Sequence, residues 1–260
     1  MKKYLNLTFL EFIEKLLNQK KEIDKDQIGK IIDTYNNFAN DCHIMPTLFI
    51  LNYCTQKFAL VSDNVKKLSG YDVSLLREEG LPFFLNIINK NDFAVYNEKI
   101  FPQNINFLNK TPQQEHSSYV FSHDYRIISK DNHTIRLHQR NTYITAPETG
   151  IPILNIGMVT NISLFKKDST ILHQIEKITP DGDENEMLYS ETYYPEGSLF
   201  TKREIEVLKW LAEGLNTLEI SHKLVTAEST ISNHRKSMME KSNSKNVAQL
   251  ITYSIRNNIL

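Results

Sequence analysis

The last sixty residues of the chain carry two helix-start signals in close succession, and these constrain the fold more than any other feature. Thr201 and Glu204 form a T-x-x-E pair, and Asn216 and Glu219 repeat the same spacing. In such a capping box each side chain accepts a hydrogen bond from a backbone N–H that has no partner within the helix. Apolar residues follow the first box at helical spacing as far as Gly214, a residue type suited to end a helix. The sequence therefore predicts two successive helices with defined starts.

Two further helices are predicted after this pair, over residues 227–241 and 246–257. Ile231 and Met238 are spaced to face inward on the first of them, while much of its remaining surface is polar. A short helix, a tight turn and a longer polar helix is the order of a helix-turn-helix motif. The major groove of DNA admits one α-helix, whose outward side chains can hydrogen-bond to base edges. The candidates for such contacts are Ser232, Asn233 and Lys236.

The charge of the chain is distributed unevenly along its length. The formal net charge is −1 overall, but residues 199–260 hold nine Lys and Arg against six Glu, a net charge of +3 that leaves −4 upstream. Averaging over the whole chain hides this asymmetry. The C-terminal segment is thus mildly basic, and it contains His222 and His234 besides.

Residues 199–260 resemble the LuxR-type (GerE-like) DNA-binding domain. The matching pieces are the REIEVL, G-L-N…E-I and T-I-x-x-H-R blocks. The resemblance implies that the third helix enters the major groove, that its neighbours contact phosphates, and that the fourth helix pairs two copies. By position it makes Ser232, Asn233 and Lys236 the base-contacting residues. It assigns backbone contacts, which position a domain without reading sequence, to Lys223, Thr230, His234 and Arg235.

Two positions depart from the pattern of this family. Ala227 stands where the family usually has a Ser or Thr helix cap, and Ser242 stands where it usually has Leu. Thr226, one residue earlier, is the alternative cap. The competing interpretation of residues 232–236 is a solvated helix face, the default for an arbitrary polar helix. Three consecutive blocks at the right spacing favour DNA binding.

Upstream of residue 199 the order of predicted elements is α+β. Two amphipathic helices come first, within residues 5–17 and 28–38. Residues 45–62 have a period near two and predict two strands, and short helical segments follow. Three more strands, joined by turn-forming segments, are predicted between residues 118 and 163. Strands in two groups with helices between them are typical of an α+β domain.

The segment from Asp181 to Glu196 has six acidic residues and no basic one. It lies within residues 168–198, which admit two interpretations, a hairpin and a solvated connector, and the connector is favoured. Its DGDENE run does not fit a twelve-residue calcium loop, because Glu186 and Thr192 stand where that loop needs Gly and Glu.

Residues 45–167 resemble the PAS fold in order and spacing. The matching residues are Asn64, Leu68, Gly70 and Tyr71 after the second strand, Asp92 at a helix start, Asp124, Tyr125, Arg126, Lys130 and Asp131 in the late strands, and the closing VTNIS. The resemblance implies a five-stranded antiparallel sheet packed against short helices, a pocket for a cofactor or small molecule, and dimerisation through a preceding helix. The cofactor stays unknown, with a small molecule as the candidate ligand, and no ligand residue is assigned.

The cofactor residues of photosensors and haem sensors are missing from this region. Its helical segment has no Asn-Cys-Arg flavin motif, and residues 65–109 contain no His that could serve as an axial haem ligand. Four histidines lie on or beside the late strands, where imidazoles could form a metal site. Without a fixed ligand spacing we expect no metal, and surface or hydrogen-bonded roles for His116, His123, His133 and His138.

Several classes of protein are disfavoured. Two cysteines are too few for a disulfide framework, and neither a signal peptide nor a membrane-spanning apolar run is evident, so we expect a cytoplasmic protein. The alternating strands and helices of a phosphorylated receiver are missing from the N-terminal half. The lack of Trp upstream of Trp210 disfavours an autoinducer-binding domain. No nucleophile with a base and an orienting group stands out, so an enzyme is not expected.

The sequence thus predicts a transcriptional regulator in four parts. They are an N-terminal helical extension (1–44), a PAS-like sensor domain (45–167), an acidic linker or hairpin (168–198) and an all-α, four-helix LuxR-type domain (199–260). The expected partners are double-stranded DNA, a second copy of the chain on DNA, and RNA polymerase, with no membrane. In the alternative interpretation the PAS-like domain is only a dimerisation or protein-interaction module.

Overall fold

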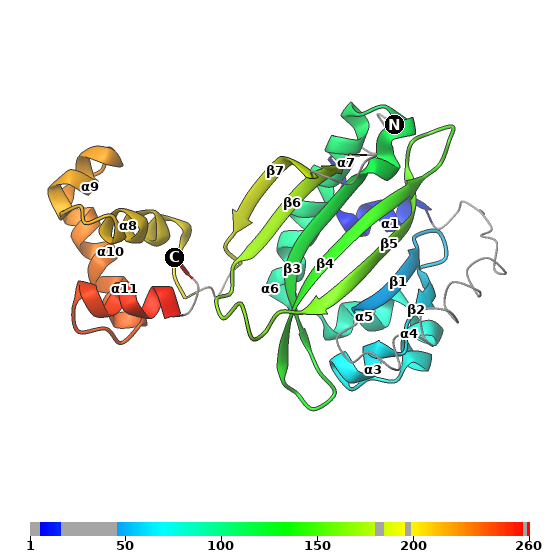
Figure 1. Ribbon diagram of the computed structural model, residues 1–260, viewed down its shortest axis with the longest axis horizontal. Helices are drawn as coiled ribbons and strands as arrows, with labels where there is room; N and C mark the ends of the chain where they lie inside the picture. Colours follow the sequence, from blue (N-terminus) through cyan, green and yellow to red (C-terminus); the bar gives the residue numbers. More distant parts are fainter. Residues whose placement is uncertain (1–5, 17–45, 180–184, 196–198, 257–258) are drawn as a thin grey trace. The chain divides into compact units, whose positions relative to one another are not determined.

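The structure is a computed structural model that describes residues 6–16, 46–179, 185–195, 199–256 and 259–260. The chain divides into two compact units (Figure 1). The first contains residues 1–162 and 171–192, and the second contains residues 163–170 and 193–260. The second of the two predicted N-terminal helices lies outside the described residues.

A seven-stranded sheet in the order β2-β1-β5-β4-β3-β6-β7 forms the framework of the first unit. Pairing is antiparallel between β1 and both β2 and β5, between β4 and both β3 and β5, and between β3 and β6. The strands are β1 (Thr47–Asn52), β2 (Lys57–Val61), β3 (Tyr119–Ile128), β4 (Thr134–Thr145), β5 (Pro152–Asn161), β6 (Ile171–Ile178) and β7 (Asn185–Tyr193).

The first five strands have the arrangement of a PAS domain. Their order, β2-β1-β5-β4-β3, with the helices inserted between β2 and β3, confirms the predicted fold class. The sheet nevertheless has two more strands than the predicted five. The favoured interpretation of residues 168–198 as a solvated connector is therefore wrong for residues 171–178 and 185–193.

The reason for this difference lies in alternate residues of β6. Ile171, His173 and Ile175 are almost fully buried, and Ile175 belongs to the main hydrophobic cluster of the unit. Successive side chains of a strand point to opposite faces, so pairing with β3 places this row of three against the core. Two of the acidic residues that suggested a connector, Glu186 and Glu191, lie beyond this strand in β7, where most side chains are exposed.

Helices cover one face of this sheet (Figure 1), and their apolar side chains pack against it in the main hydrophobic cluster. A π-helical turn over Tyr96–Ile100 links α6 to α7, and a 3₁₀ turn over Gln113–Ser118 precedes β3. The α-helices are α1 (Phe9–Leu16), α3 (Asn64–Ser69), α4 (Val73–Glu79), α5 (Leu81–Ile87), α6 (Lys90–Val95) and α7 (Phe101–Lys110).

The N-terminal helix α1 is part of the core of the first unit. Phe9, Phe12, Ile13 and Leu16 are buried, at the spacing of one helix face. Phe9 packs edge-to-face on Tyr53 at 5.9 Å between ring centroids, and it also contacts rings from α6, the π-helical turn and α7. This helix therefore contributes to the PAS-like core rather than only preceding it.

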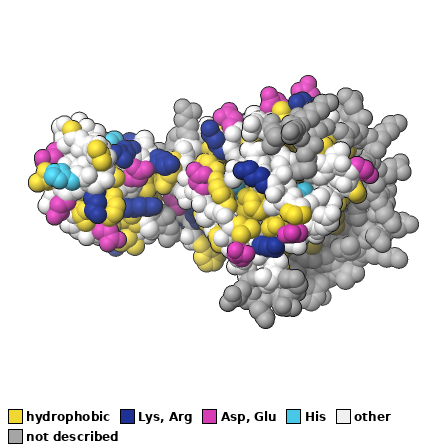
Figure 2. All heavy atoms as spheres, turned by 90° about the horizontal axis from the view of Figure 1, so that it is seen from above, with side chains coloured by type: hydrophobic (Ala, Val, Ile, Leu, Met, Phe, Trp, Pro, Cys, Tyr) yellow, Lys and Arg dark blue, Asp and Glu magenta, His cyan; other side chains and the backbone are white. Residues whose placement is uncertain are grey.

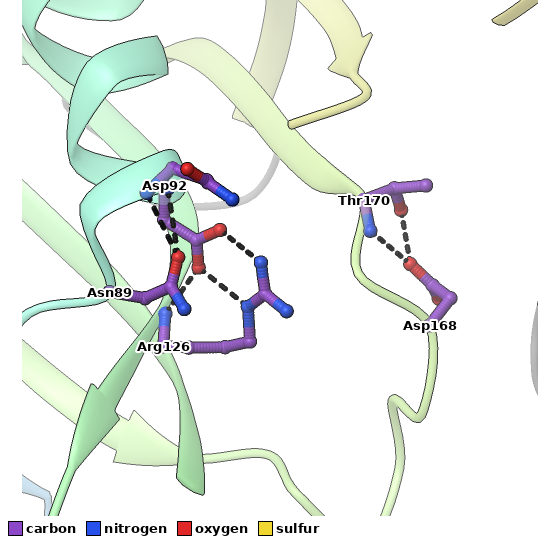
Figure 3. Close-up of polar contacts among 6 residues, drawn as sticks. Asn89, Asp92, Arg126, Asp168 and Thr170 are labelled. Carbon is purple, nitrogen blue, oxygen red and sulfur yellow. Dashed lines mark hydrogen bonds and ion pairs between the residues drawn. The ribbon is translucent and has the colours of Figure 1, made fainter. Parts of the chain in front are cut away.

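A buried ion pair joins the helical layer to the sheet (Figure 3). Asn89 caps α6 by accepting hydrogen bonds from the backbone N–H groups of Asn91 and Asp92. The carboxylate of Asp92, which is fully buried, accepts hydrogen bonds from the backbone and the guanidinium of Arg126 on β3. Both residues belong to the motif that suggested a PAS domain, and their contact fixes α6 against β3.

The second unit is a four-helix domain built around its own hydrophobic cluster. Both predicted capping boxes are present, Thr201 with Glu204 and Asn216 with Glu219. Gly214 follows the first helix with a φ of 88°, a conformation that favours glycine. The helices are α8 (Lys202–Ala212), α9 (Thr217–Lys223), α10 (Glu228–Lys241) and α11 (Val247–Arg256).

The last helix buries a narrower face than its apolar spacing suggests. Leu250 and Ser254 are fully buried, whereas Ile255 is exposed. Ser254 satisfies its hydroxyl by donating to the carbonyl of Leu250, so a small polar residue fills the inward position. Among the described residues of both units, no helix is long and apolar enough to cross a membrane.

Candidate nucleic-acid interface and ligand cavity

Helix α10 starts without a side-chain cap. Ala227 occupies the N-cap position in an extended conformation, and no side-chain hydrogen bond caps the helix there. The hydroxyl of Thr226 instead donates to the carbonyl of Leu224 and accepts from the guanidinium of Arg203. The suggestion that Thr226 replaces the missing cap is therefore wrong, because its oxygen is engaged in the turn and with α8.

The turn between α9 and α10 contains a residue in an unfavourable conformation. Val225 has a φ of 49° and is 93% exposed. A β-branched residue rarely adopts the left-handed region, because its side chain crowds the backbone. The turn is closed by a hydrogen bond of 2.9 Å from the backbone N–H of Thr226 to the carbonyl of Ser221.

The three predicted base-contacting residues lie on the exposed surface of α10. Ser232, Asn233 and Lys236 are all exposed, whereas Ile231 and Met238 are fully buried on the inward face. Lys236 lies 3.9 Å from a carboxylate oxygen of Glu240, at the outer limit of an ion pair between two solvated side chains. These groups are free to reorient toward a ligand at little cost.

Two of the four predicted backbone-contacting residues, Lys223 and Arg235, contact side chains of neighbouring helices. Arg235 donates a hydrogen bond from its guanidinium to the hydroxyl of Thr217, the first residue of α9. The Lys223 ammonium lies 5.3 Å from the centre of the Trp210 ring, within range of a cation–π contact. Thr230 and His234 are half-buried on α10. The structure thus places Lys223 and Arg235 beside α8 and α9.

Basic side chains of this unit are interspersed with other kinds. At the left of Figure 2, Lys and Arg side chains lie among acidic, hydrophobic and histidine side chains. This agrees with the modest net charge of the segment.

A buried carboxylate between α8 and α10 was not expected from the sequence beyond its role as a cap. Glu204 accepts hydrogen bonds from the Ser237 hydroxyl at 2.7 Å, from the Lys241 ammonium at 2.7 Å and from the Thr201 backbone at 2.8 Å. Burial alone raises the pKa of this carboxyl, but the hydrogen bonds from Lys241, Thr201 and Ser237 outweigh it and lower the pKa. Ser237 and Lys241 are four residues apart, so they share one helix face. This spacing is the feature of the sequence from which their common contact could have been predicted.

The first unit contains a cavity of about 100 Å³ between the sheet and the helices. Its wall is mostly apolar and aromatic, and it includes Phe9 from α1, Phe84 from α5 and Val159 from β5. The aromatic residues of this domain are divided between the cavity wall and the core. The structure places Tyr53 and Phe58 in the wall, while Phe101 is buried in the core.

Polar side chains from three strands and one turn reach the same cavity. His123, Gln139 and Asn155 line it from β3, β4 and β5, and Tyr53 follows β1. The hydroxyl of Tyr53, Nδ1 of His123 and Oδ1 of Asn155 are buried and have no hydrogen bond of ordinary geometry to a described residue. Buried polar groups are normally hydrogen-bonded, so these three atoms need an explanation.

The ionisable groups of this region stay uncharged near neutral pH. Burial lowers the pKa of His123 to about 3, and the neighbouring His173 adds to this effect. Burial likewise raises the pKa of Tyr53 well above its usual value, with a further contribution from Tyr143. His123 stacks on Tyr96 at 5.0 Å between ring centres.

The remaining three of the four histidines considered for a metal site either lie near protein oxygen atoms or are exposed. His116 is buried, with its ring nitrogens 3.0 Å from the Thr145 hydroxyl and from the Leu108 carbonyl. Nδ1 of His138 lies 2.7 Å from the Asp124 carboxylate, and His133 is exposed. Within the described ranges, no group of three or more His, Cys, Asp or Glu is arranged to hold a metal ion.

Comparison with known proteins identifies the second unit. Residues 198–254 match the family model of the bacterial regulatory proteins of the luxR family. An uncharacterized transcriptional regulatory protein of Bacillus subtilis, YxjL, is 41% identical over 61 residues, which is 24% of this chain and 28% of that protein. The regulatory protein SdiA of Escherichia coli is 42% identical over 55 residues, 21% of this chain and 23% of SdiA. The chain therefore spans less than a third of either relative.

Solved structures with similar chains include a PAS/PAC sensor domain of a diguanylate cyclase from Marinobacter aquaeolei. It is 18% identical, covers 46% of this chain and 97% of that chain, and has a TM-score of 0.35. A Vibrio cholerae VqmA dimer solved without its target DNA is 14% identical and covers 86% of this chain and 88% of that chain, with a TM-score of 0.33. Both TM-scores are low, so the PAS-like assignment rests on the strand order above. The chain combines a PAS-like domain with a C-terminal helix-turn-helix domain of the LuxR type.

Proposed function

We propose that the protein is a sequence-specific DNA-binding regulator of transcription whose PAS-like domain binds a small molecule and thereby controls the DNA-binding domain. One observation carries the DNA-binding part. The second helix of a LuxR-type helix-turn-helix motif presents three exposed polar side chains, Ser232, Asn233 and Lys236, opposite a buried face. A helix of this kind fits the major groove, where such groups hydrogen-bond to base edges. The proposal includes no catalytic step.

The proposed partners follow from this role. They are double-stranded DNA, a second copy of the chain bound to it, and RNA polymerase at the promoter, with the cytoplasm as the place of action. Two copies would read half-sites about one helical turn apart. The phosphate contacts are assigned to Lys223, Thr230, His234 and Arg235.

The sensing part of the proposal is supported by the cavity of the PAS-like domain. A cavity lined by aromatic and apolar residues, with a few polar groups on its wall, is typical of a small-molecule site. Its wall includes side chains from α1, α5 and the central strands, so occupancy would affect several elements at once. A ligand shifts the DNA-binding equilibrium only if it binds one conformational state more tightly than the other.

The DNA-binding part can be tested by selecting bound sequences from random double-stranded DNA with the full-length protein. We expect one enriched motif with two-fold symmetry. Lys236→Ala should change or relax this motif, whereas Lys209→Ala, which removes an exposed lysine from α8, should leave it unchanged. Absence of any enriched motif for the wild-type protein would refute sequence-specific binding.

A second candidate function is an interaction module, and exposed apolar side chains on the sheet favour it. Met187 and Leu188 on β7 are 47% and 39% exposed, and Met158 on β5 is 42% exposed. Figure 2 also shows hydrophobic side chains gathered on the visible face of the first unit. Exposed apolar patches commonly mark surfaces that bind other proteins.

Two adjacent residues of β5 separate these candidates because they lie on opposite faces of the sheet. Val159 lines the cavity, and Met158 is exposed. If the domain senses a ligand, Val159→Phe should alter DNA affinity by filling the cavity, and Met158→Glu should not. If the domain is an interaction module, Met158→Glu should reduce the mass of the complex in light scattering while Val159→Phe has little effect.

A further inference from the structure

We propose that the cavity of the PAS-like domain takes a small uncharged molecule with a largely apolar body and one polar group, and that this group bonds to Tyr53. The inference rests on the proposed sensing function and specifies its ligand. It is carried by the chemistry of the cavity wall, taken in three steps: its charge, its unpaired polar atoms and its size.

The wall of the cavity carries no formal charge. None of the residues that line it is Asp, Glu, Lys or Arg, and its histidine, His123, is neutral near pH 7 because burial lowers its pKa to about 3. An ionised ligand would lose its hydration on entry and find no opposite charge, which is costly in an apolar site. Carboxylates, phosphates and ammonium ions are therefore excluded as ligands.

Two of the three unpaired polar atoms, those of Tyr53 and Asn155, belong to neighbouring side chains. The backbone N–H of Tyr53 donates to the carbonyl of Ile153, which places Tyr53 beside β5 two residues from Asn155. The Tyr53 side chain also lies near those of Tyr96 and Tyr143, and the Tyr96 ring stacks on His123. His123 itself is farther from Asn155, because it lies opposite Gln139 on β4, which lies opposite Val159, four residues from Asn155 along β5.

These atoms define what the polar group of the ligand must supply. The amide oxygen of Asn155 only accepts hydrogen bonds, so it requires a donor. The Tyr53 hydroxyl can donate or accept, and neutral His123 offers one of these roles at Nδ1. A hydroxyl or amide group both donates and accepts, so it can bond to Tyr53 and Asn155 together.

A second tyrosine in the wall provides an internal comparison. Tyr125 also lines the cavity, but its hydroxyl donates to Oε1 of Gln139 at 3.2 Å. The domain therefore satisfies the Tyr125 hydroxyl with its own residue, whereas the Tyr53 hydroxyl has Asn155, Tyr96 and Tyr143 nearby but no hydrogen bond of ordinary geometry to a described residue. This difference marks Tyr53 as the residue that contacts the ligand.

The size of the cavity limits the ligand to about one ring. This cavity, at about 100 Å³, is smaller than the closed apolar cavity of about 150 Å³ that holds benzene in another protein, but it is not fully enclosed, so a ligand of one ring can extend toward its mouth. A fluorinated phenol is thus a suitable probe for its chemistry, because it combines an apolar ring with one hydroxyl group.

The test is ¹⁹F NMR titration of the full-length protein at pH 7.5 with 4-fluorophenol, fluorobenzene and 4-fluorobenzoate. We expect 4-fluorophenol to bind about tenfold more tightly than fluorobenzene, and 4-fluorobenzoate not to bind. Tyr53→Phe should abolish the preference for 4-fluorophenol and leave fluorobenzene binding unchanged. Tyr125→Phe, the matched control, should change neither affinity by more than about twofold.

Each contrary result overturns a defined part of the inference. Equal binding of 4-fluorobenzoate and 4-fluorophenol would refute an uncharged ligand, although the cavity would remain a binding site. Equal effects of Tyr53→Phe and Tyr125→Phe would refute Tyr53 as the polar contact. Binding of no probe would refute the ligand class altogether and leave water as the partner of these atoms. DNA binding by the same protein samples is measured separately, so failure of the proposed regulatory function is recognised independently.

Discussion

The carboxylate of Asp92 accepts three hydrogen bonds from Arg126, one from the backbone N–H at 2.7 Å and two from the guanidinium at 2.9 and 2.5 Å. Asp92 is fully buried at the start of α6, and Arg126 lies 34 residues later on β3. The contact closes the helical layer over the sheet and thereby forms one side of the cavity-bearing domain.

Removing the charge of Asp92 should destabilise the first unit strongly. Asp92→Asn leaves the Arg126 guanidinium partly buried without a counter-charge, and breaking a buried pair in this way costs about 3–5 kcal/mol. Urea unfolding followed by circular dichroism measures the loss. The control is Lys66→Gln, which breaks the exposed pair with Asp72 and should cost less than about 1 kcal/mol. Equal losses for both variants would contradict the structural role of Asp92.

Relieving the backbone strain at Val225 should stabilise the second unit. Asn tolerates a φ of 49° better than a β-branched residue does, so Val225→Asn is expected to add about 1 kcal/mol to the free energy of unfolding. Val225→Ile keeps the strain and should change little. Trp210 is the only tryptophan of the chain and lies in the second unit, so its fluorescence during guanidinium titration reports the unfolding of that unit. A destabilised Asn variant would show that Val225 is not strained.

The stability of the first unit should fall in acid because two histidines are buried as neutral rings. Burial lowers the pKa of His123 to about 3 and that of His173 to about 4, from a usual value near 6.5. The unfolded chain therefore binds more protons than the folded chain between about pH 6.5 and pH 4, and stability falls as the pH falls through this window. Each histidine contributes a slope of about 1.4 kcal/mol per pH unit.

Substituting one buried histidine separates its contribution to the pH dependence of stability from the contributions of other groups. His123→Leu should reduce the slope of the unfolding free energy between pH 4.5 and pH 6 by about 1.4 kcal/mol per pH unit. His133→Asn removes an exposed histidine and should leave the slope unchanged. Urea unfolding at several pH values gives both slopes. An unaltered slope for His123→Leu would mean that this ring is not held neutral by the fold.

The exposed residues of α10 should determine which DNA sequence is bound. Asn233→Ala and Lys236→Ala should each reduce discrimination at particular base pairs by about 1–3 kcal/mol. Fluorescence anisotropy with the selected operator and its single-base variants, at one salt concentration, measures this discrimination. Unchanged discrimination in both variants would remove these residues as base contacts.

Arg235 should instead affect all DNA sequences alike. If its guanidinium contacts a phosphate, Arg235→Ala should weaken binding uniformly and reduce the slope of log affinity against log salt by about one unit. The guanidinium also bonds to Thr217, so loss of this internal contact needs a control. Thr217→Val removes the contact but keeps the positive charge, and the salt slope should then be retained. Equal slopes for the wild type and Arg235→Ala would contradict a phosphate contact.

Features that depend on neighbouring residues were predictable from the sequence. Both capping boxes, the helix end at Gly214 and the inward positions of Ile231 and Met238 are present in the structure. Each of these features results from contacts within one turn of helix, or from the periodicity of one helix face. The strands of the PAS-like sheet were recognised for the same reason, because their alternating pattern is local.

Features that depend on distant residues were decided only by the tertiary structure. Three such features are the addition of β6 and β7 to the sheet, the burial of α1 in the core and the placement of Arg235 against Thr217. Each brings together segments that are separated in the sequence, so the periodicity of one segment does not reveal its contact with the other. The cavity belongs to this group, since its wall is assembled from α1, the short helices and five strands of the sheet. The sequence by itself determined the local elements and their order, and tertiary packing decided which side chains face the same space, because burial depends on what the rest of the chain brings to that place.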